Sequence, residues 1–224
     1  MELKAIEINT DQYPKELLPY LEGKQVFDSS CSEEARVLFI DAEEGYFLKM
    51  APKGSLKAEA LMLKYFYDLG LAPEVLQHLT SDQDYLLSKK ALGTDCTEQY
   101  ILDQPERLVD VLASSMLMLH GLDTKDCPLE SQEYIDKIEG LAADVIIHGD
   151  FCLPNILLDR WQFSAFIDLG GAGLGDRHID IYWALWSLAY NLKTDRYRDR
   201  FKDAYGRRLI QEDILDAIAR VEGS

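Results

Sequence analysis

The sequence predicts an α+β fold with two lobes, a β-rich lobe followed by a mainly helical one. Three observations support this prediction. Residues 35–51 have the pattern of a β-hairpin, the pattern changes to helical periodicity after Gly93, and short apolar strands return between residues 145 and 168 with polar residues beside them. The 224 residues are enough for two small lobes around a cleft.

The first lobe is expected to be built around a hairpin. Its strands, ARVLFID and GYFLKMA, are rich in β-forming residues, and Glu44-Gly45 between them supplies a turn. Two further strands are expected near residues 75–79 and 85–88. A linker near residues 89–93 then separates a first lobe of residues 1–90 from a second of residues 91–224.

One long helix is expected within the first lobe. Ser55 is a suitable N-cap, and Gly70 and Pro73 stop the helix after Leu69. Its apolar positions follow helical spacing: Leu56, Leu63 and Phe66. Glu59 falls on this same apolar face, which is an unusual place for a carboxylate.

The second lobe is expected to open with a helix from Pro105 to Gly121. Short strands are predicted at residues 145–148, 156–159 and 163–168, followed by helices from about Ile179 onward. This order places polar residues at the ends of strands, beside the predicted cleft.

Composition excludes several classes of protein. Lys and Arg number 23 against 40 Asp and Glu, which gives a formal charge of −17. This charge disfavours nucleic acid as a partner and would attract a cationic small molecule. A solvated acidic surface is the simpler explanation of the charge. The four cysteines form no CxxC pair, so neither a zinc site nor a disulfide framework is expected. No apolar run reaches the length of a membrane span, and the N-terminus lacks a secretory pattern, so a cytoplasmic location is expected. No pattern indicates the oligomeric state.

The densest group of polar residues lies in HGDFCLPN, residues 148–155, and FIDLGGAGLGDRHID, residues 166–180. Phosphoryl transfer needs one group to orient and deprotonate the attacking hydroxyl, and oxygen ligands to hold magnesium against the phosphates. Asp150, Asn155 and Asp168 can supply these groups. Each alone is more often a turn former or a cap, but their joint order favours chemistry.

This joint order resembles the aminoglycoside phosphotransferase family, whose fold is similar to that of protein kinases. The motif HGDxxxxN, a strand and then Asp-x-Gly carry the resemblance. The segments CLPN at 152–155, FIDLG at 166–170, and LHGLD at 119–123 with the following Cys127-Pro128, resemble the 3′-phosphotransferase branch in particular. The resemblance implies ATP- and Mg²⁺-dependent transfer of a phosphoryl group to a small hydroxylated, cationic acceptor, most simply an aminoglycoside, and hence antibiotic resistance.

The resemblance also assigns roles to residues. Asp150 would be the catalytic residue, and Asn155 and Asp168 would hold the metal. Lys49 would hold the α- and β-phosphates, and Glu59 would pair with Lys49.

Two further positions would contact the nucleotide. The loop of residues 29–32, with Ser32, would cover the phosphates, and the linker at Ala91 would meet the adenine. His148 would support the loop from behind, and Asp176, Arg177 and Asp180 would form an ion-paired brace.

The chain departs from the family pattern in three places. Only 19 residues separate Pro128 from His148, where the family has a longer helical insertion. Gly171 stands where the 3′ branch commonly has an arginine, and Glu222 is all that represents the acidic, aromatic C-terminal end. These departures leave open a kinase for another small molecule, such as choline, homoserine or a macrolide, and a non-catalytic nucleotide-binding relative. A dinucleotide-binding loop is disfavoured, because the glycines after residue 169 do not have GxGxxG spacing.

Overall fold

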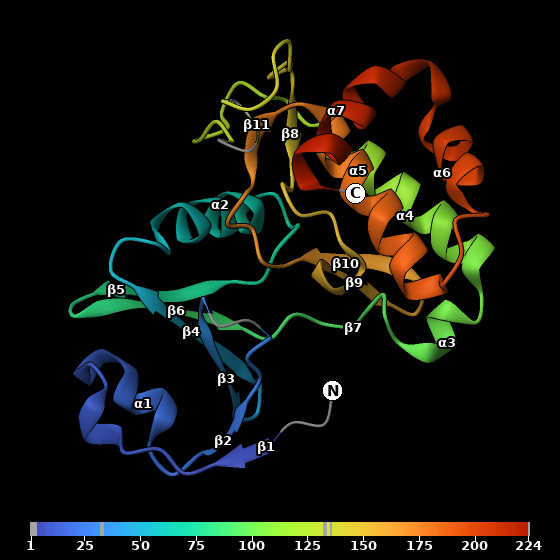
Figure 1. Ribbon diagram of the computed structural model, residues 1–224. Helices are drawn as coiled ribbons and strands as arrows, with labels where there is room; N and C mark the ends of the chain where they lie inside the picture. The colour runs from blue at the N-terminus through green and yellow to red at the C-terminus, as the bar shows by residue number, and fades with distance from the viewer. Residues whose placement is uncertain (1–3, 32–33, 132–133, 135, 224) are drawn as a thin grey trace.

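The chain folds into a sheet-rich N-terminal lobe and a mainly helical C-terminal lobe (Figure 1). The computed structural model describes residues 4–31, 34–131, 134 and 136–223. The bilobal α+β architecture expected from the sequence is confirmed. None of the helices in these described residues is long and apolar enough to cross a bilayer.

The N-terminal lobe is a six-stranded antiparallel sheet in the order β1-β2-β3-β4-β6-β5. Its strands are β1 (Lys4–Ile6), β2 (Gln25–Asp28), β3 (Arg36–Asp41), β4 (Tyr46–Pro52), β5 (Val75–Thr80) and β6 (Gln83–Lys89). The predicted hairpin is confirmed as β3 and β4, and Gly45 adopts a positive φ of 69° in the turn between them. The short helix α1 (Leu18–Leu21) covers one face of the sheet, and Leu17 and Leu21 are buried there.

Helix α2 (Lys57–Asp68) confirms the predicted helix but not its predicted cap. The Ser55 hydroxyl donates to the Pro52 carbonyl, and the Leu56 N–H donates to the Asp84 carboxylate at 3.0 Å instead. A side chain from β6 therefore caps α2, because it reaches the orphan N–H from a neighbouring element.

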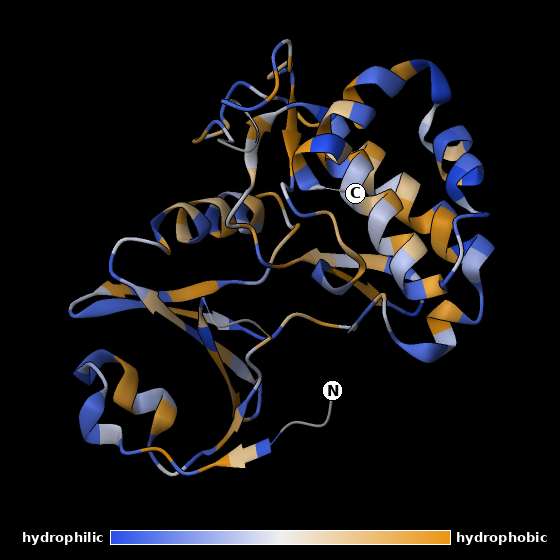
Figure 2. Cartoon of the chain, viewed as in Figure 1, coloured by the Kyte–Doolittle hydropathy of each residue, from blue (hydrophilic) through white to orange (hydrophobic). Residues whose placement is uncertain are grey.

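The C-terminal lobe packs helices over two small sheets. Its helices are α3 (Gln99–Leu102), α4 (Pro105–His120), α5 (Arg177–Leu192), α6 (Arg198–Tyr205) and α7 (Glu212–Glu222). One sheet has the order β10-β9-β7, formed by β10 (Gln162–Phe166), β9 (Ile156–Asp159) and β7 (Thr94–Asp95), and the other pairs β11 (Gly173–Gly175) with β8 (Val145–Ile147). Figure 2 shows apolar residues gathered on β8, β9 and β10, whereas α6 is largely hydrophilic.

One apolar cluster joins α2 to the C-terminal lobe. Phe66 of α2 meets Phe166 of β10 with ring centroids 6.1 Å apart, and the Phe166 N–H donates to the Leu71 carbonyl at 2.8 Å. Helix α2 is thereby fixed against the segment that follows β10, and this contact sets the position of Glu59 relative to Asp168.

Candidate active site

Lys49, Glu59 and Asp168 form one cluster between the lobes. The Lys49 ammonium donates to both Glu59 oxygens, at 3.0 and 2.8 Å, and to Asp168 Oδ1 at 2.5 Å. Glu59 lies on the buried face of α2, and its residue is only 5% exposed. Burial alone would lower the pKa of Lys49, but the Glu59 and Asp168 carboxylates outweigh it and hold that pKa above its ordinary value. Lys49 is therefore a firmly charged cation at the predicted phosphate site.

Asp150 and Asn155 form a second cluster in the loop after β8. The Asn155 side-chain amide donates to Asp150 Oδ2 at 2.8 Å and to the Asp150 carbonyl at 3.1 Å. A single 3₁₀ turn, η3 (Leu153–Asn155), brings the two side chains together across Pro154. Because both bonds use the amide N–H groups of Asn155, its side-chain oxygen is left to act as a ligand.

The two clusters are connected through the backbone. The Ile167 N–H donates to the Asn155 carbonyl at 3.0 Å, so Asp168 is one residue from this link. Strand β10 ends at Phe166, two residues before the predicted end, and Asp168 has a φ of 61°. This left-handed conformation is sparsely populated by residues other than glycine and often marks functional segments. The Asp168 side chain is 52% exposed.

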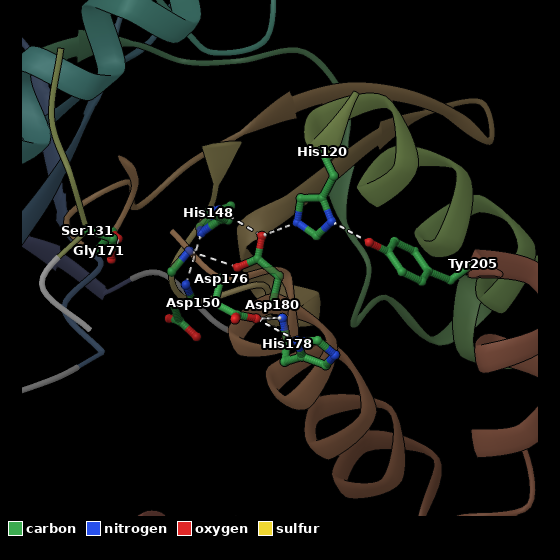
Figure 3. Close-up of polar contacts among 10 residues, drawn as sticks. His120, Ser131, His148, Asp150, Gly171, Asp176, His178, Asp180 and Tyr205 are labelled. Carbon is green, nitrogen blue, oxygen red and sulfur yellow. Dashed lines mark hydrogen bonds and ion pairs between the residues drawn. The ribbon is translucent and has the colours of Figure 1, made fainter. Parts of the chain in front are cut away.

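Asp180 holds the loop after β8, which carries Asp150, in place (Figure 3). This fully buried carboxylate accepts the backbone N–H groups of His148 at 2.8 Å and Gly149 at 2.9 Å. His120 Nε2 lies 3.1 Å from Asp180 Oδ2, and His120 Nδ1 lies 2.8 Å from the Tyr205 hydroxyl. Asp180 is therefore linked to the ends of α4 and α6 as well as to the loop.

The predicted brace is partly wrong. Arg177 pairs with Asp144 at 3.2 Å, while Asp176 accepts from the His178 ring at 2.6 Å and from the Ala142 N–H at 2.8 Å. Asp180 bonds directly to the loop that carries Asp150, whereas Asp176 bonds to Ala142 and His178, and Arg177 bonds to Asp144. Arg177 is the first residue of α5, and its side chain is 20% exposed beside the 56% exposed side chain of Asp144.

His148 supports the loop as expected from the sequence. The residue is fully buried, its ring lies against Phe151 and Phe166, and its Nδ1 lies 3.3 Å from the Asp150 backbone N–H. An N–H can donate only to an unprotonated ring nitrogen, so Nδ1 acts as the acceptor in this contact.

Gly149 allows two backbone segments to approach closely. It adopts a φ of 84°, and a Cβ at this position would lie 2.2 Å from the Gly171 carbonyl oxygen. The same carbonyl accepts the Ser131 hydroxyl at 2.9 Å. The loop carrying Asp150 and the loop after Asp168 are thus in backbone contact, which fixes their relative position.

The other two residues predicted to contact the nucleotide are Ser32 and Ala91. Ser32 lies outside the described residues. Ser30, from the same loop, bonds to the chain itself: its N–H donates to Asp28 at 3.0 Å, and its hydroxyl accepts the Val37 N–H at 3.0 Å. Ala91 is partly buried in the linker, two residues beyond the end of β6.

The sequence alone predicts no role for His120 or Tyr205. His120 belongs to the LHGLD segment, and its position at the end of an apolar helix is a signal of a buried polar partner. Tyr205 lies 85 residues farther along the chain, and no local pattern connects the two.

The connection between α4 and β8 is short, as the sequence indicated. Within the described part of residues 129–144 there is no helix, and an isolated bridge joins Glu130 to Leu174. The Tyr134 hydroxyl donates to Glu222 at 2.8 Å, so the C-terminal helix lies against this connection.

Comparison with known proteins gives a consistent result. The sequence profile of the phosphotransferase enzyme family matches residues 131–216. A probable aminoglycoside 3′-phosphotransferase of Lactococcus lactis is 39% identical over 256 aligned positions that cover 98% of each chain. Since 256 positions exceed the 224 residues of this chain, the relative contains segments that this chain lacks.

Solved structures share the fold. The crystal structure of an aminoglycoside 3′-phosphotransferase of type VIII matches with a TM-score of 0.73 and 21% identity, over 92% of this chain and 93% of that one. An aminoglycoside phosphotransferase from Streptomyces rimosus, solved with ADP and streptomycin, matches with a TM-score of 0.61 and 19% identity, over 76% and 83%. The near-complete match at 39% identity goes further than the fold: this chain belongs to the phosphotransferase enzyme family, in its aminoglycoside 3′-phosphotransferase branch.

Proposed function

We propose that this protein transfers the γ-phosphoryl group of ATP to a hydroxyl group of an aminoglycoside. The observation that carries the proposal is the joining of Lys49 to both Glu59 and Asp168, from three separate segments of the chain. A phosphoryl-transfer site of the protein-kinase type uses such a lysine–glutamate pair beside a metal-binding aspartate.

The proposed reaction assigns one role to each polar residue. The acceptor oxygen forms a bond to the γ-phosphorus while the bond from that phosphorus to the β–γ bridging oxygen breaks, and ADP leaves. Asp150 orients the acceptor hydroxyl and takes its proton. Lys49 binds the α- and β-phosphates. Catalysis on this scheme consists mainly of positioning and charge neutralisation.

The residues fit a magnesium ion. The bonds from Asn155 to Asp150 use its amide nitrogen and not its side-chain oxygen, and the Asp168 side chain is 52% exposed. Magnesium prefers oxygen ligands and keeps several water and phosphate ligands, so one or two side-chain oxygens from the protein are enough to bind it. When bound, magnesium neutralises charge on the phosphates.

The nucleotide is proposed to lie between the two lobes. The proposed boundary between the lobes falls between residues 90 and 91. Adenine would contact the linker backbone near Ala91, and the Lys49 cluster would hold the phosphates. The ADP complex of the related Streptomyces rimosus enzyme supports ATP as the donor.

The acceptor is proposed to be an aminoglycoside, because the relatives are named as aminoglycoside 3′-phosphotransferases. A chain with a formal charge of −17 also attracts polycations, and aminoglycosides carry several protonated amines. The same names do not favour the alternatives of a choline, homoserine or macrolide kinase, or of a non-catalytic relative.

Asp150→Ala tests the proposal. ADP release from ATP would be measured with magnesium and kanamycin, neomycin, choline, homoserine or a macrolide offered separately. Aminoglycosides are expected to stimulate release, and the variant is expected to lose about 100-fold or more of kcat while its Kd for ATP changes less than about threefold.

Asp159→Ala is the matched control. Asp159 ends β9 in the same lobe, and its side chain forms an exposed ion pair at 3.3 Å with Arg160 beside it. This variant is expected to keep parental turnover. Near-parental turnover by Asp150→Ala would overturn the catalytic assignment, and stimulation by choline or homoserine alone would overturn the acceptor assignment.

A further inference from the structure

A buried line of hydrogen bonds joins α6 to the loop that carries Asp150 (Figure 3). The Tyr205 hydroxyl lies 2.8 Å from His120 Nδ1, and His120 Nε2 lies 3.1 Å from Asp180 Oδ2. Asp180 in turn accepts two backbone N–H groups of the loop, one on each carboxylate oxygen. The proposed reaction assigns no role to Tyr205 or His120, yet both lie on a continuous path to the loop with the proposed catalytic residue.

The line is closed to water. Tyr205 is 2% exposed, Asp180 is fully buried, and the His120 side chain is 3% exposed. Tyr205 also stacks on Phe201, with planes 1° apart, and meets the His120 ring edge-on with centroids 5.7 Å apart. Packing therefore holds the Tyr205 hydroxyl in one place beside His120 Nδ1, and burial makes each hydrogen bond costly to lose.

The donors and acceptors along the line have one consistent order. The Asp180 carboxylate can only accept, so His120 Nε2 carries the proton that is donated to it. In a neutral imidazole the other nitrogen is an acceptor, so the Tyr205 hydroxyl donates to Nδ1. Burial raises the pKa of Tyr205 to about 12, against the opposing charge of Arg177, so the hydroxyl has its proton at neutral pH. The two partners together specify one tautomer and one orientation of the His120 ring.

We propose that Tyr205 is a positioning residue for phosphoryl transfer, which acts on Asp150 through the His120 ring. By fixing this ring, Tyr205 keeps the Asp180 carboxylate in the orientation that holds the loop. The inference rests on the proposed function, since Asp150 is the residue that is positioned. His120 and the His148 N–H share the same Asp180 oxygen, Oδ2. A His120 ring that rotates therefore disturbs the bond that holds the loop.

This role predicts which kinetic constant changes. A displacement of the loop moves the general base relative to the acceptor hydroxyl, and the rate depends steeply on that geometry. The phosphates of ATP are assigned to Lys49 in the other lobe, where its ammonium lies 2.8 Å from Glu59. Loss of the Tyr205 hydroxyl should therefore lower kcat and leave the affinity for ATP unchanged.

Tyr205→Phe removes the hydroxyl and keeps the ring. With magnesium, ATP and kanamycin, ADP release by the full chain is expected to show a kcat at least about threefold below that of the parent. The KM values for ATP and kanamycin are expected to stay within about twofold of the parent. Tyr85→Phe is the matched control: Tyr85 is also 2% exposed, but it lies in β6, in the apolar cluster that includes Leu21 of α1. This control should keep the parental kcat.

A double substitution tests whether Tyr205 acts through His120. The glutamine side chain of His120→Gln can donate an amide N–H to Asp180 and has no tautomer for a neighbour to fix. In the His120→Gln background, Tyr205→Phe is therefore expected to change kcat by less than about twofold. A purely structural contribution of the hydroxyl would instead lower kcat by a similar factor in both backgrounds.

Heteronuclear NMR of the histidine ring nitrogens gives a readout without turnover. The parent is expected to show His120 as a neutral ring with its proton on Nε2 and with Nδ1 accepting a hydrogen bond. In Tyr205→Phe, the Nδ1 resonance is expected to move to the position of a nitrogen that accepts none.

The positioning role is overturned, with the proposed function intact, if the parent phosphorylates kanamycin and Tyr205→Phe keeps kcat within about threefold of it. It is also overturned if Tyr85→Phe loses as much kcat, if the double substitution loses the full factor again, or if NMR places the ring proton of His120 on Nδ1 in the parent. If the parent phosphorylates none of the acceptors offered, the proposed function and the positioning role both fail.

Discussion

At the scale of single residues, the charge of Glu59 is the least expected feature of α2. A carboxylate on the apolar face of a helix costs desolvation energy, which the Lys49 ammonium at 2.8 Å offsets. Lys49 also binds Asp168 at 2.5 Å, so the two carboxylates compete for one ammonium. Because Glu59 binds the Lys49 ammonium as well, Asp168, the proposed metal ligand, does not hold that ammonium alone.

Glu59→Gln should therefore impair ATP use more than folding. Without the Glu59 charge, the Lys49 ammonium stays with Asp168 and is displaced from the phosphates. We expect kcat/KM for ATP to fall about 10- to 100-fold, measured by ADP release. The free energy of unfolding should change by less than about 1 kcal/mol, because the buried charge that is removed was costly and Lys49 keeps Asp168 as a partner.

Glu44→Gln is the control for this prediction, since Glu44 forms a surface pair with Lys89 at 2.9 Å. It should leave both quantities unchanged. A Glu59→Gln variant with parental kcat/KM would show that the pairing with Lys49 is dispensable.

Asp176 provides a prediction about pH. Burial alone would raise its pKa, but the His178 side chain and the N–H groups of Ala142 and His178 outweigh burial and hold the pKa of Asp176 below its ordinary value. The carboxylate therefore stabilises the fold at pH values above the ordinary Asp pKa of about 3.9. This contribution is lost as the pH falls below that value and through the folded-state pKa.

Asp176→Asn should lower the free energy of unfolding by about 1–3 kcal/mol at neutral pH. The Asn side-chain nitrogen is itself a donor, so it cannot accept an N–H group that the Asp176 carboxylate accepts in the parent. The difference from the parent should shrink as the pH is lowered below about 4. Denaturant unfolding at several pH values measures both effects. A difference that is constant down to pH 3 would contradict the assigned ionisation.

At the scale of elements, the start of α2 depends on a residue from a strand. Asp84 of β6 is fully buried, accepts the Leu56 N–H at 3.0 Å and accepts the Thr80 hydroxyl at 2.8 Å. Glu59 lies in the first turn of the same helix. The end of the sheet therefore determines where α2 begins and where it presents Glu59.

Asp84→Ala should loosen this first turn. The loss of the cap should cost about 1–2 kcal/mol of unfolding free energy. It should also raise the KM for ATP a few-fold, because Glu59 holds Lys49 less firmly; thermal unfolding and ADP-release kinetics measure the two effects. The matched control is Asp82→Ala, in the exposed turn between β5 and β6. Equal effects of both substitutions would argue against the capping role.

At the scale of the whole molecule, the formal charge of −17 gives a long-range attraction for a polycation. The loop after β8, which carries Asp150, lies on the lobe that would receive this acceptor. Attraction between separated charges is screened by salt, whereas the close contacts of a buried cluster are screened less.

Raising sodium chloride from about 50 mM to about 300 mM should therefore increase the KM for kanamycin several-fold. The KM for magnesium-bound ATP should not rise, because screening weakens the repulsion between an anionic donor and an acidic protein. Initial rates at both salt concentrations test this. A second series with potassium acetate in place of sodium chloride separates the effect of ionic strength from effects of the anion. A kanamycin KM that is independent of salt would exclude a role for the net charge.

The sequence by itself determined the order of the elements and most of the proposed catalytic residues. The β3–β4 hairpin, α2, α4 and the strands around the HGD segment follow from local periodicity and turn residues, because these depend on neighbours in the chain. The contact between Asp150 and Asn155 was predictable for the same reason, since they are five residues apart across a loop that contains Pro154.

Only the tertiary structure decided the contacts between distant segments. The capping of α2 by Asp84, the pairing of Arg177 with Asp144, and the link from Tyr205 through His120 to Asp180 join residues about 30 or more positions apart. Local propensity contains no information about such pairs. They form because a buried polar group without a partner is costly, and the fold determines which partner is within reach.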